Sequence, residues 1–132
     1  IVHNHLKEEQ GTIESTIGRH PVDRKKMAMN VKNGKHAVTH YTVLDTLNNK
    51  YTYIQCNLET GRTHQIRVHM ASIGHPILGD SVYGPAKCPF HLQGQTLHAK
   101  TLGFIHPRTK KYIEFDAPLP EYFKKLLTTL KG

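Results

Sequence analysis

The sequence has 132 residues, 37% of them hydrophobic, and carries 18 Lys+Arg against 10 Asp+Glu, a formal net charge of +8. The length favours one domain, and no apolar run approaches the roughly 18–20 residues of a membrane span. These values exclude membrane-spanning, collagen-like and wholly disordered proteins. Two cysteines, Cys56 and Cys88, are too few for a disulfide scaffold and lack zinc-site spacing, so a reducing, cytoplasmic setting is expected.

The first part of the chain predicts two strands and a basic loop. Residues 1–6 (IVHNHL) are apolar and β-prone, and resemble the middle of a strand at which a longer chain was cut. Residues 12–17 (TIESTI) alternate polar and apolar side chains, as a half-buried strand does. Residues 18–35 contain Pro21 and the turn signal Asn33-Gly34, which favour a loop.

The strongest local signal is an antiparallel hairpin. β-branched and aromatic residues dominate residues 36–47 and 51–59, and Asn48-Asn49 supplies the turn between them. Its tyrosines could stack on bases, but at this spacing hairpin core positions or cross-strand pairs are the favoured interpretation.

A helix is expected directly after this hairpin. Thr63 is positioned to cap a helix over residues 64–73, with Gly74 in the left-handed position that follows it. Ile66, Met70 and Ile73 recur at the spacing of one helical face, which is expected to be buried.

The last third predicts a second strand pair over residues 97–106 and 111–116, followed by an amphipathic helix that begins at Pro120. Strands with unevenly inserted helices indicate an α+β fold, with a mostly antiparallel mixed sheet and a few flanking helices.

Positive charge is concentrated between the second predicted strand and the hairpin. Asp23 is the only acid in a stretch whose basic and imidazole side chains are Arg19, His20, Arg24, Lys25, Lys26, Lys32, Lys35 and His36. Clustering on this scale favours a phosphate-facing segment over an evenly mixed surface. The sequence therefore predicts an RNA or DNA contact here, with a solvated basic surface as the alternative.

Residues 58–69 (LETGRTHQIRVH) form the segment densest in chemistry-bearing side chains. A strand leads through a glycine turn into a helix whose start holds Arg62, His64 and Gln65, a setting suited to a phosphate or carboxylate. Arg67 lies inside that helix, where its guanidinium could pair a carboxylate bidentately. An ordinary amphipathic helix with solvated arginines is the competing interpretation.

The sequence does not support a metal site or another common type of catalytic site. His64 and His69 do not share a helix face, and no His-Glu-x-x-His, Cys-x-x-Cys, dinucleotide-binding, P-loop or nucleophile-elbow motif is present. No metal site is expected. Cys56 is expected to pack in the core, and Cys88 has no partner that would stabilise a thiolate.

Residues 58–69, together with residues 73–80 (IGHPILGD) and 82–84 (VYG), closely resemble the signature of the RluA-type pseudouridine synthases. The resemblance extends to residues 17–21, 23–27, 39–41, 97–99, 104–107 and 117–120. It spans nearly the whole chain, and the long motif is far more specific than a short pattern.

This resemblance implies an RNA-modifying enzyme that isomerises uridine to pseudouridine without a cofactor or metal, in ribosomal RNA or transfer RNA. Arg67 matches the family's basic residue that pairs the nucleophilic aspartate, and a planar, permanently charged fork suits that role. Because the uridine must leave its stack, affinity has to come from surrounding phosphates. The residues expected to contact RNA are Arg19, Arg24, Lys25, Lys26, Arg62, His64 and Gln65.

The family's nucleophilic aspartate has no match among the motifs of this sequence. The family's aspartate lies in an Arg-Leu-Asp segment, whereas Asp23, Asp45, Asp80 and Asp116 all lack that context. Asp80 fits the role of a turn residue or hydrogen-bond anchor better than the role of the nucleophile. Residues 1–132 are therefore expected to be the C-terminal portion of a single catalytic domain, inactive alone, whose N-terminal portion carries the nucleophile. The alternative is a non-catalytic RNA-binding module that retains the scaffold.

Overall fold

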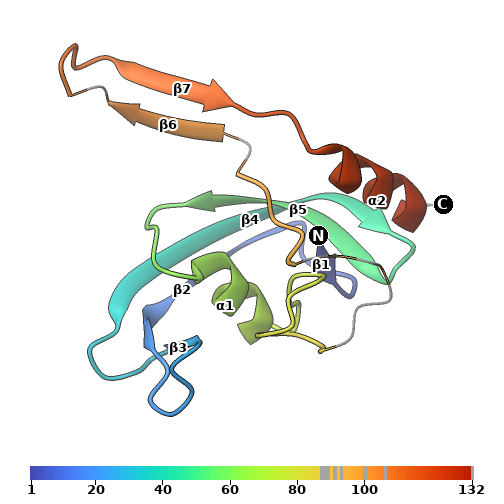
Figure 1. Ribbon diagram of the computed structural model, residues 1–132, viewed down its shortest axis with the longest axis horizontal. Coiled ribbons are helices and arrows are strands. Elements are labelled where there is room, and N and C mark those ends of the chain that lie inside the picture. Colours follow the sequence, from blue (N-terminus) through green and yellow to red (C-terminus); the bar gives the residue numbers. More distant parts are fainter. Residues whose placement is uncertain (87–89, 91, 93, 100, 106, 132) are drawn as a thin grey trace.

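Five antiparallel strands form the main sheet of the computed structural model, which describes residues 1–86, 90, 92, 94–99, 101–105 and 107–131 (Figure 1). The strand order is β1-β5-β4-β2-β3. Its strands are β1 (Val2–His3), β2 (Gln10–Arg19), β3 (Met27–Met29), β4 (Lys35–Leu47) and β5 (Tyr51–Leu58). The remaining elements are the helices α1 (Gln65–Ser72) and α2 (Glu121–Lys131) and the strands β6 (Thr101–Ile105) and β7 (Tyr112–Asp116). The expected α+β class is confirmed.

The β4–β5 hairpin forms where the sequence predicts it. Leu47 pairs with Tyr51 across the turn, and Asn48 and Asn49 adopt left-handed φ values of 54° and 56°. Asparagine tolerates this conformation better than most non-glycine residues. The register shifts between Val43 and Asp45, a bulge that bends the long β4 strand.

The prediction of a continuous loop over residues 18–35 is wrong in part. β2 continues to Arg19, and residues 27–29 return beside it as β3, with Arg19 opposite Met27 and Ile17 opposite Met29. Three residues are too few to show the alternating pattern of a strand, and the surrounding cations are typical of a loop. The basic segment is therefore a short hairpin with a defined tip at residues 20–26.

The expected cap of α1 is wrong, and its expected buried face is wrong in part: Met70 is buried and Ile66 packs against a core cluster, but Ile73 is not buried. His64, not Thr63, occupies the N-cap position, with a left-handed φ of 56° and no side-chain capping bond. The buried residues of the helix are Gln65, Val68, His69 and Met70, whereas Ile73 is 39% exposed. Gly74 does follow the helix with a φ of 85°, as expected.

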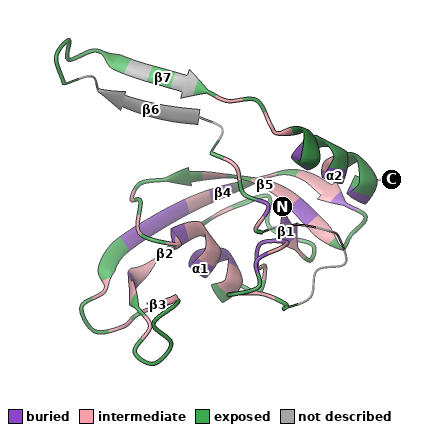
Figure 2. Cartoon of the chain, viewed as in Figure 1, coloured by how far each residue is buried: buried purple, intermediate pink, exposed green. Residues whose placement is uncertain are grey.

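Two apolar clusters hold the elements together (Figure 2). In one, Phe123, Leu126 and Leu130 of α2 pack on Leu47 and Leu78. In the other, Met70 of α1 packs with Tyr41, Ile13 and Val2, and Cys56 lies against this cluster. The amphipathic C-terminal helix and the core position of Cys56 are thus confirmed, and burial raises the pKa of the Cys56 thiol to about 11. Cys88 lies outside the described residues.

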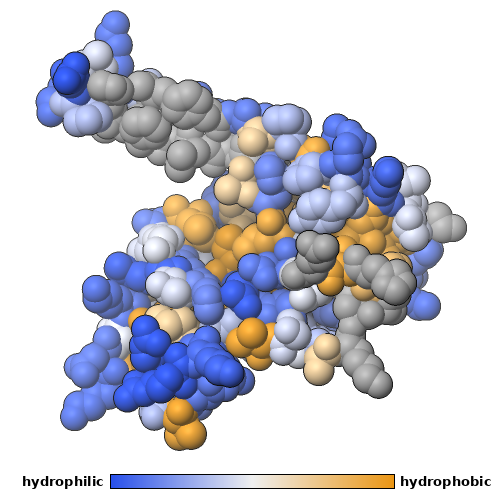
Figure 3. Space-filling view, viewed as in Figure 1, coloured by the Kyte–Doolittle hydropathy of each residue, from blue (hydrophilic) through white to orange (hydrophobic). Residues whose placement is uncertain are grey.

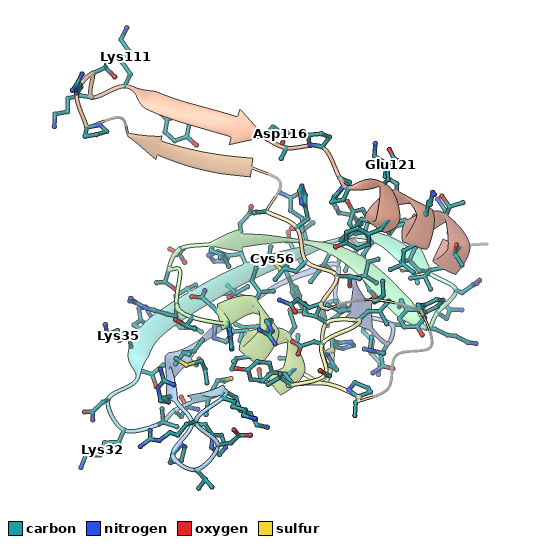
Figure 4. All side chains as sticks on the ribbon, viewed as in Figure 1. Lys32, Lys35, Cys56, Lys111, Asp116 and Glu121 are labelled. Carbon is teal, nitrogen blue, oxygen red and sulfur yellow. The ribbon has the colours of Figure 1, made fainter. Side chains whose placement is uncertain are left out.

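β6 and β7 form the predicted second strand pair as a separate hairpin, which projects away from the main sheet in Figure 1. Lys111 marks its far end in Figure 4. Within the described part of the chain, neither helix has the length and apolar character needed to cross a bilayer.

Candidate functional site

Arg67 and Asp80 form the central ion pair of the site. Arg67 Nε donates to Asp80 Oδ2 at 2.8 Å, and Nη2 donates to Oδ1 at 3.1 Å. The Asp80 side chain is fully buried and also accepts the backbone N–H groups of Val82 and Tyr83 at 3.0 and 3.2 Å. Burial would raise the pKa of Asp80, but the Arg67 and backbone hydrogen bonds outweigh it and lower that pKa. Asp80 is therefore an ionised anchor that fixes both the turn and the guanidinium.

The ion pair leaves one edge of the guanidinium open. No contact to Nη1 of Arg67 is found among the described residues, where every buried polar side-chain atom has a hydrogen-bond partner. The Arg67 side chain is 13% exposed, and no described residue occupies Nη1. A guanidinium has five N–H donors in a fixed plane, so an arginine held along one edge can still bind a second carboxylate or phosphate along another.

Tyr83 connects this ion pair to two other elements. Its ring lies 5.1 Å from Arg67 Cζ, in the arrangement of a cation–π contact. Its hydroxyl accepts the backbone N–H of Met27 in β3 at 2.7 Å and lies 2.8 Å from Nδ1 of His64. Tyr83 thus links the turn after residue 76, the start of α1 and the tip end of the β2–β3 hairpin.

His64 has a left-handed backbone conformation. Its φ of 56° is uncommon for a residue other than glycine, although histidine is enriched there together with asparagine and aspartate. Partial burial lowers its pKa, and the nearby Arg67 lowers it further, so the imidazole is neutral near pH 7. The histidine therefore presents a hydrogen-bonding group and not a positive charge.

Gln65 does not serve the role that the sequence predicts. Its side chain is buried, with the whole residue 3% exposed, and its amide donates to the carbonyl oxygen of Val38 and the hydroxyl of Thr39. Its carbonyl oxygen accepts from Thr60 Oγ1 and from the backbone N–H of Arg62. Gln65 uses its hydrogen-bonding capacity inside the fold, so it is corrected from an RNA contact to an internal brace of the turn.

His69 extends the same polar layer beneath α1. It is fully buried, and its Nδ1 and Nε2 lie 2.7 and 2.9 Å from the hydroxyls of Thr39 and Ser15. Burial lowers the pKa of His69, which keeps the ring neutral. Sequence reasoning missed this layer, because polar residues on a helix face are normally assigned to the solvent side.

The basic side chains gather at the β2–β3 end of the sheet. Arg19, Arg24 and Lys25 are exposed and Lys26 is partly exposed, and the hydrophilic region of Figure 3 covers this end. Lys32 and Lys35 lie at the same end in Figure 4. Arg62 Nε donates to the carbonyl oxygen of His36 at 2.8 Å, which brings Arg62 to this surface. The hydrogen bond from Met27 to Tyr83 connects the basic hairpin to Arg67 through the Tyr83 side chain.

Asp80 is the only carboxylate among the described residues that forms an ion pair with Arg67. Asp23 accepts the backbone N–H of Lys25, Asp45 pairs with Lys131, and Asp116 lies in the separate β6–β7 hairpin. The described residues include no group of three or more His, Cys, Asp or Glu side chains that could hold a metal ion.

Curated relatives are similar in sequence to this chain over most of its length. A protein of Bacillus subtilis named uncharacterized RNA pseudouridine synthase YlyB is 50% identical over 131 residues, covering 99% of this chain and 42% of that protein. The ribosomal large subunit pseudouridine synthase D of Zymomonas mobilis is 47% identical over 129 residues, covering 92% of this chain and 40% of that protein. The chain thus spans about two fifths of the length of these relatives.

The fold and a family model agree with these relatives. The solved structure of human RNA pseudouridylate synthase domain containing 1 superposes with a TM-score of 0.77 at 26% identity, over 99% of this chain and 63% of that chain. Residues 1–72, more than half of the chain, match the model of the family described as RNA pseudouridylate synthase. The resemblance of the sequence motifs is therefore confirmed, and the chain belongs to the RNA pseudouridylate synthase family.

Proposed function

We propose that residues 1–132 form the C-terminal, arginine-bearing portion of a catalytic domain that converts uridine in RNA into pseudouridine. In this proposal the nucleophilic aspartate comes from a part of the protein outside these residues. The observation that carries the proposal is the open edge of Arg67. Asp80 fixes the direction of this edge, and no second carboxylate of the described chain pairs with it.

Arg67 would hold the incoming aspartate ionised and aimed at the substrate. An opposite charge within hydrogen-bonding distance favours the charged form of a carboxyl group, and a planar fork fixes its direction. The reaction breaks the bond between the ribose anomeric carbon and N1, turns the base, and joins the same carbon to C5. N1 gains a proton and C5 loses one, so substrate and product have the same atoms.

The RNA surface of this proposal consists of exposed and partly exposed cations around the site and of His64 as a neutral donor. The cations are Arg19, Arg24, Lys25, Lys26 and Arg62. The support is their gathering beside Arg67 and the chain's net charge of +8. Relatives named for the ribosomal large subunit favour ribosomal RNA as the substrate. A cytoplasmic location goes with this substrate and is part of the proposal.

The activity is tested with the full-length protein and large-subunit ribosomal RNA transcribed without modifications. Pseudouridine should accumulate in the RNA with no added nucleotide, and a metal chelator should leave the rate unchanged once the RNA itself is folded. Binding of this RNA without any pseudouridine would instead favour the non-catalytic RNA-binding module and overturn the proposal.

The basic hairpin tip makes a separate prediction about affinity. Replacing Arg24, Lys25 and Lys26 together by Gln should reduce the slope of log affinity against log salt by about two, because each phosphate contact contributes roughly 0.7 with single-stranded RNA. The matched control changes Lys124, Lys125 and Lys131 of α2 to Gln, which removes the same charge on another surface. If both triple variants change the slope equally, the tip is not an RNA-binding surface.

A further inference from the structure

We propose that His64 donates a hydrogen bond from Nε2 to an acceptor oxygen of the bound RNA, and that Tyr83 is the positioning residue that sets this donor. The inference rests on the proposed function, because it places the RNA at the surface where Arg67 is open. It adds a directed hydrogen-bond donor to a site whose other surface groups are cations.

The position of the proton on His64 is inferred from the hydrogen bonds around Tyr83. The Tyr83 hydroxyl already accepts the backbone N–H of Met27, and its single hydrogen needs an acceptor. Nδ1 of His64, 2.8 Å away, is that acceptor. In a neutral imidazole the proton then resides on Nε2, on the side of the ring directed away from Tyr83.

Nε2 of His64 has no hydrogen-bond partner among the described residues, and His64 is partly exposed. The imidazole and the Arg67 guanidinium contact the same tyrosine ring, with 5.6 Å between the His64 and Tyr83 ring centroids and 5.1 Å from Arg67 Cζ. Both groups therefore adjoin Tyr83, close enough for the Arg67 charge to lower the pKa of His64.

The backbone around His64 favours the same conclusion. The turn is braced by the Gln65 side chain and by the hydrogen bond from the Val68 N–H to the His64 carbonyl oxygen, so its geometry does not depend on the imidazole. Asparagine or glycine would suit a φ of 56° better than histidine does. A strained side chain held in this way is typical of functional sites.

Two substitutions in the full-length protein separate the two sides of the imidazole ring. His64→Asn retains an acceptor at the position of Nδ1, and so the Tyr83 hydrogen bond, but lacks a group at the position of Nε2. His64→Gln places an amide N–H at the position of Nε2 but loses the Nδ1 acceptor. We expect His64→Asn to lower kcat/KM about tenfold, the usual effect of losing one hydrogen bond of this kind, and His64→Gln to lower it less than threefold.

Stability should change in the opposite order, which excludes misfolding as the cause. Asparagine is the better residue at a left-handed φ, so His64→Asn should unfold at a temperature equal to or above that of the parent, and His64→Gln below it. His40→Asn, on β4 and bonded to Glu59, is the matched control and should leave kcat/KM unchanged. If His64→Asn is as active as His64→Gln or more so, the donor assignment is wrong.

Tyr83→Phe tests the positioning role. The ring stays beside Arg67, but the hydroxyl that holds Nδ1 is lost, so nitrogen NMR should show His64 changing from one tautomer to a mixture, with a several-fold loss of kcat/KM. Tyr122→Phe, on the exposed side of α2, is the control. An unchanged His64 tautomer in Tyr83→Phe would overturn the role of Tyr83.

The kinetic constants also identify the acceptor. If the acceptor is a phosphate oxygen, His64→Asn should raise KM and the Kd for RNA at constant kcat. If the acceptor is a uracil carbonyl, His64→Asn should lower kcat at constant Kd. Because Kd is measured directly, the phosphate arm is tested even if the full-length protein forms no pseudouridine, which distinguishes failure of this inference from failure of the proposed function. An unchanged Kd together with an unchanged kcat contradicts both acceptors.

Discussion

In the full-length protein, Arg67→Met should reduce the rate of pseudouridine formation by at least a hundredfold, whereas Arg67→Lys should retain more of it. Methionine has a similar length but no charge, so the nucleophilic carboxylate loses its partner and its orientation in a poorly solvated pocket. Removing a single preorganised donor at a reacting centre costs about 10²–10³ in rate. Lysine restores a point charge without the bidentate geometry. Both rates are measured as initial rates on the same ribosomal RNA.

Loss of folding has to be separated from loss of chemistry in Arg67→Met. The substitution leaves Asp80 as an unpaired buried charge, which costs about 3–5 kcal/mol of stability. The double variant Arg67→Met with Asp80→Asn removes that charge, so it should recover much of the stability while remaining inactive. RNA affinity should fall far less than the rate in each variant. A double variant with near-normal turnover would remove Arg67 from the site.

The second large effect concerns residues 1–132 expressed alone. Incubated with ribosomal RNA that the full-length protein modifies, this chain should form no pseudouridine. A guanidinium that is permanently protonated cannot act as nucleophile or general base, and Asp80 is buried and bonded to Arg67 and two backbone N–H groups. Circular dichroism has to show the folded sheet, and salt-dependent RNA binding has to persist, for the comparison to count. Product formation by the folded chain would place the nucleophile within residues 1–132.

Sequence reasoning works best here where the signal is local. The β4–β5 hairpin is correctly predicted because two long runs of β-branched and aromatic residues flank Asn48-Asn49, and both asparagines adopt the left-handed conformation that the turn needs. The C-terminal helix is predicted for the same reason, since Phe123, Leu126 and Leu130 repeat at helical spacing and are buried. Period and turn chemistry alone determine these elements.

The site is less predictable, because its geometry depends on contacts distant in the sequence. The family motif identifies Arg67, but its pairing with Asp80 spans 13 residues and the contact of Tyr83 with Met27 spans 56. Gln65 was misassigned for a physical reason: its amide is bonded to β4, and only the fold shows that this helix face is covered. The left-handed φ of His64 has no signature in the sequence, since most histidines have a negative φ even though histidine is enriched in this region.

The central claim is that the open edge of Arg67 holds a carboxylate from outside residues 1–132, and a crystal structure of the full-length protein tests it most directly. The account predicts that Asp80 stays on Nε and Nη2 of Arg67, and that an aspartate outside this chain lies within about 3 Å of Nη1, the distance of a charge-assisted hydrogen bond. It also predicts that replacing that aspartate by asparagine abolishes pseudouridine formation. A full-length structure in which Nη1 faces only solvent or Asp80, in a protein that forms pseudouridine, would contradict the account.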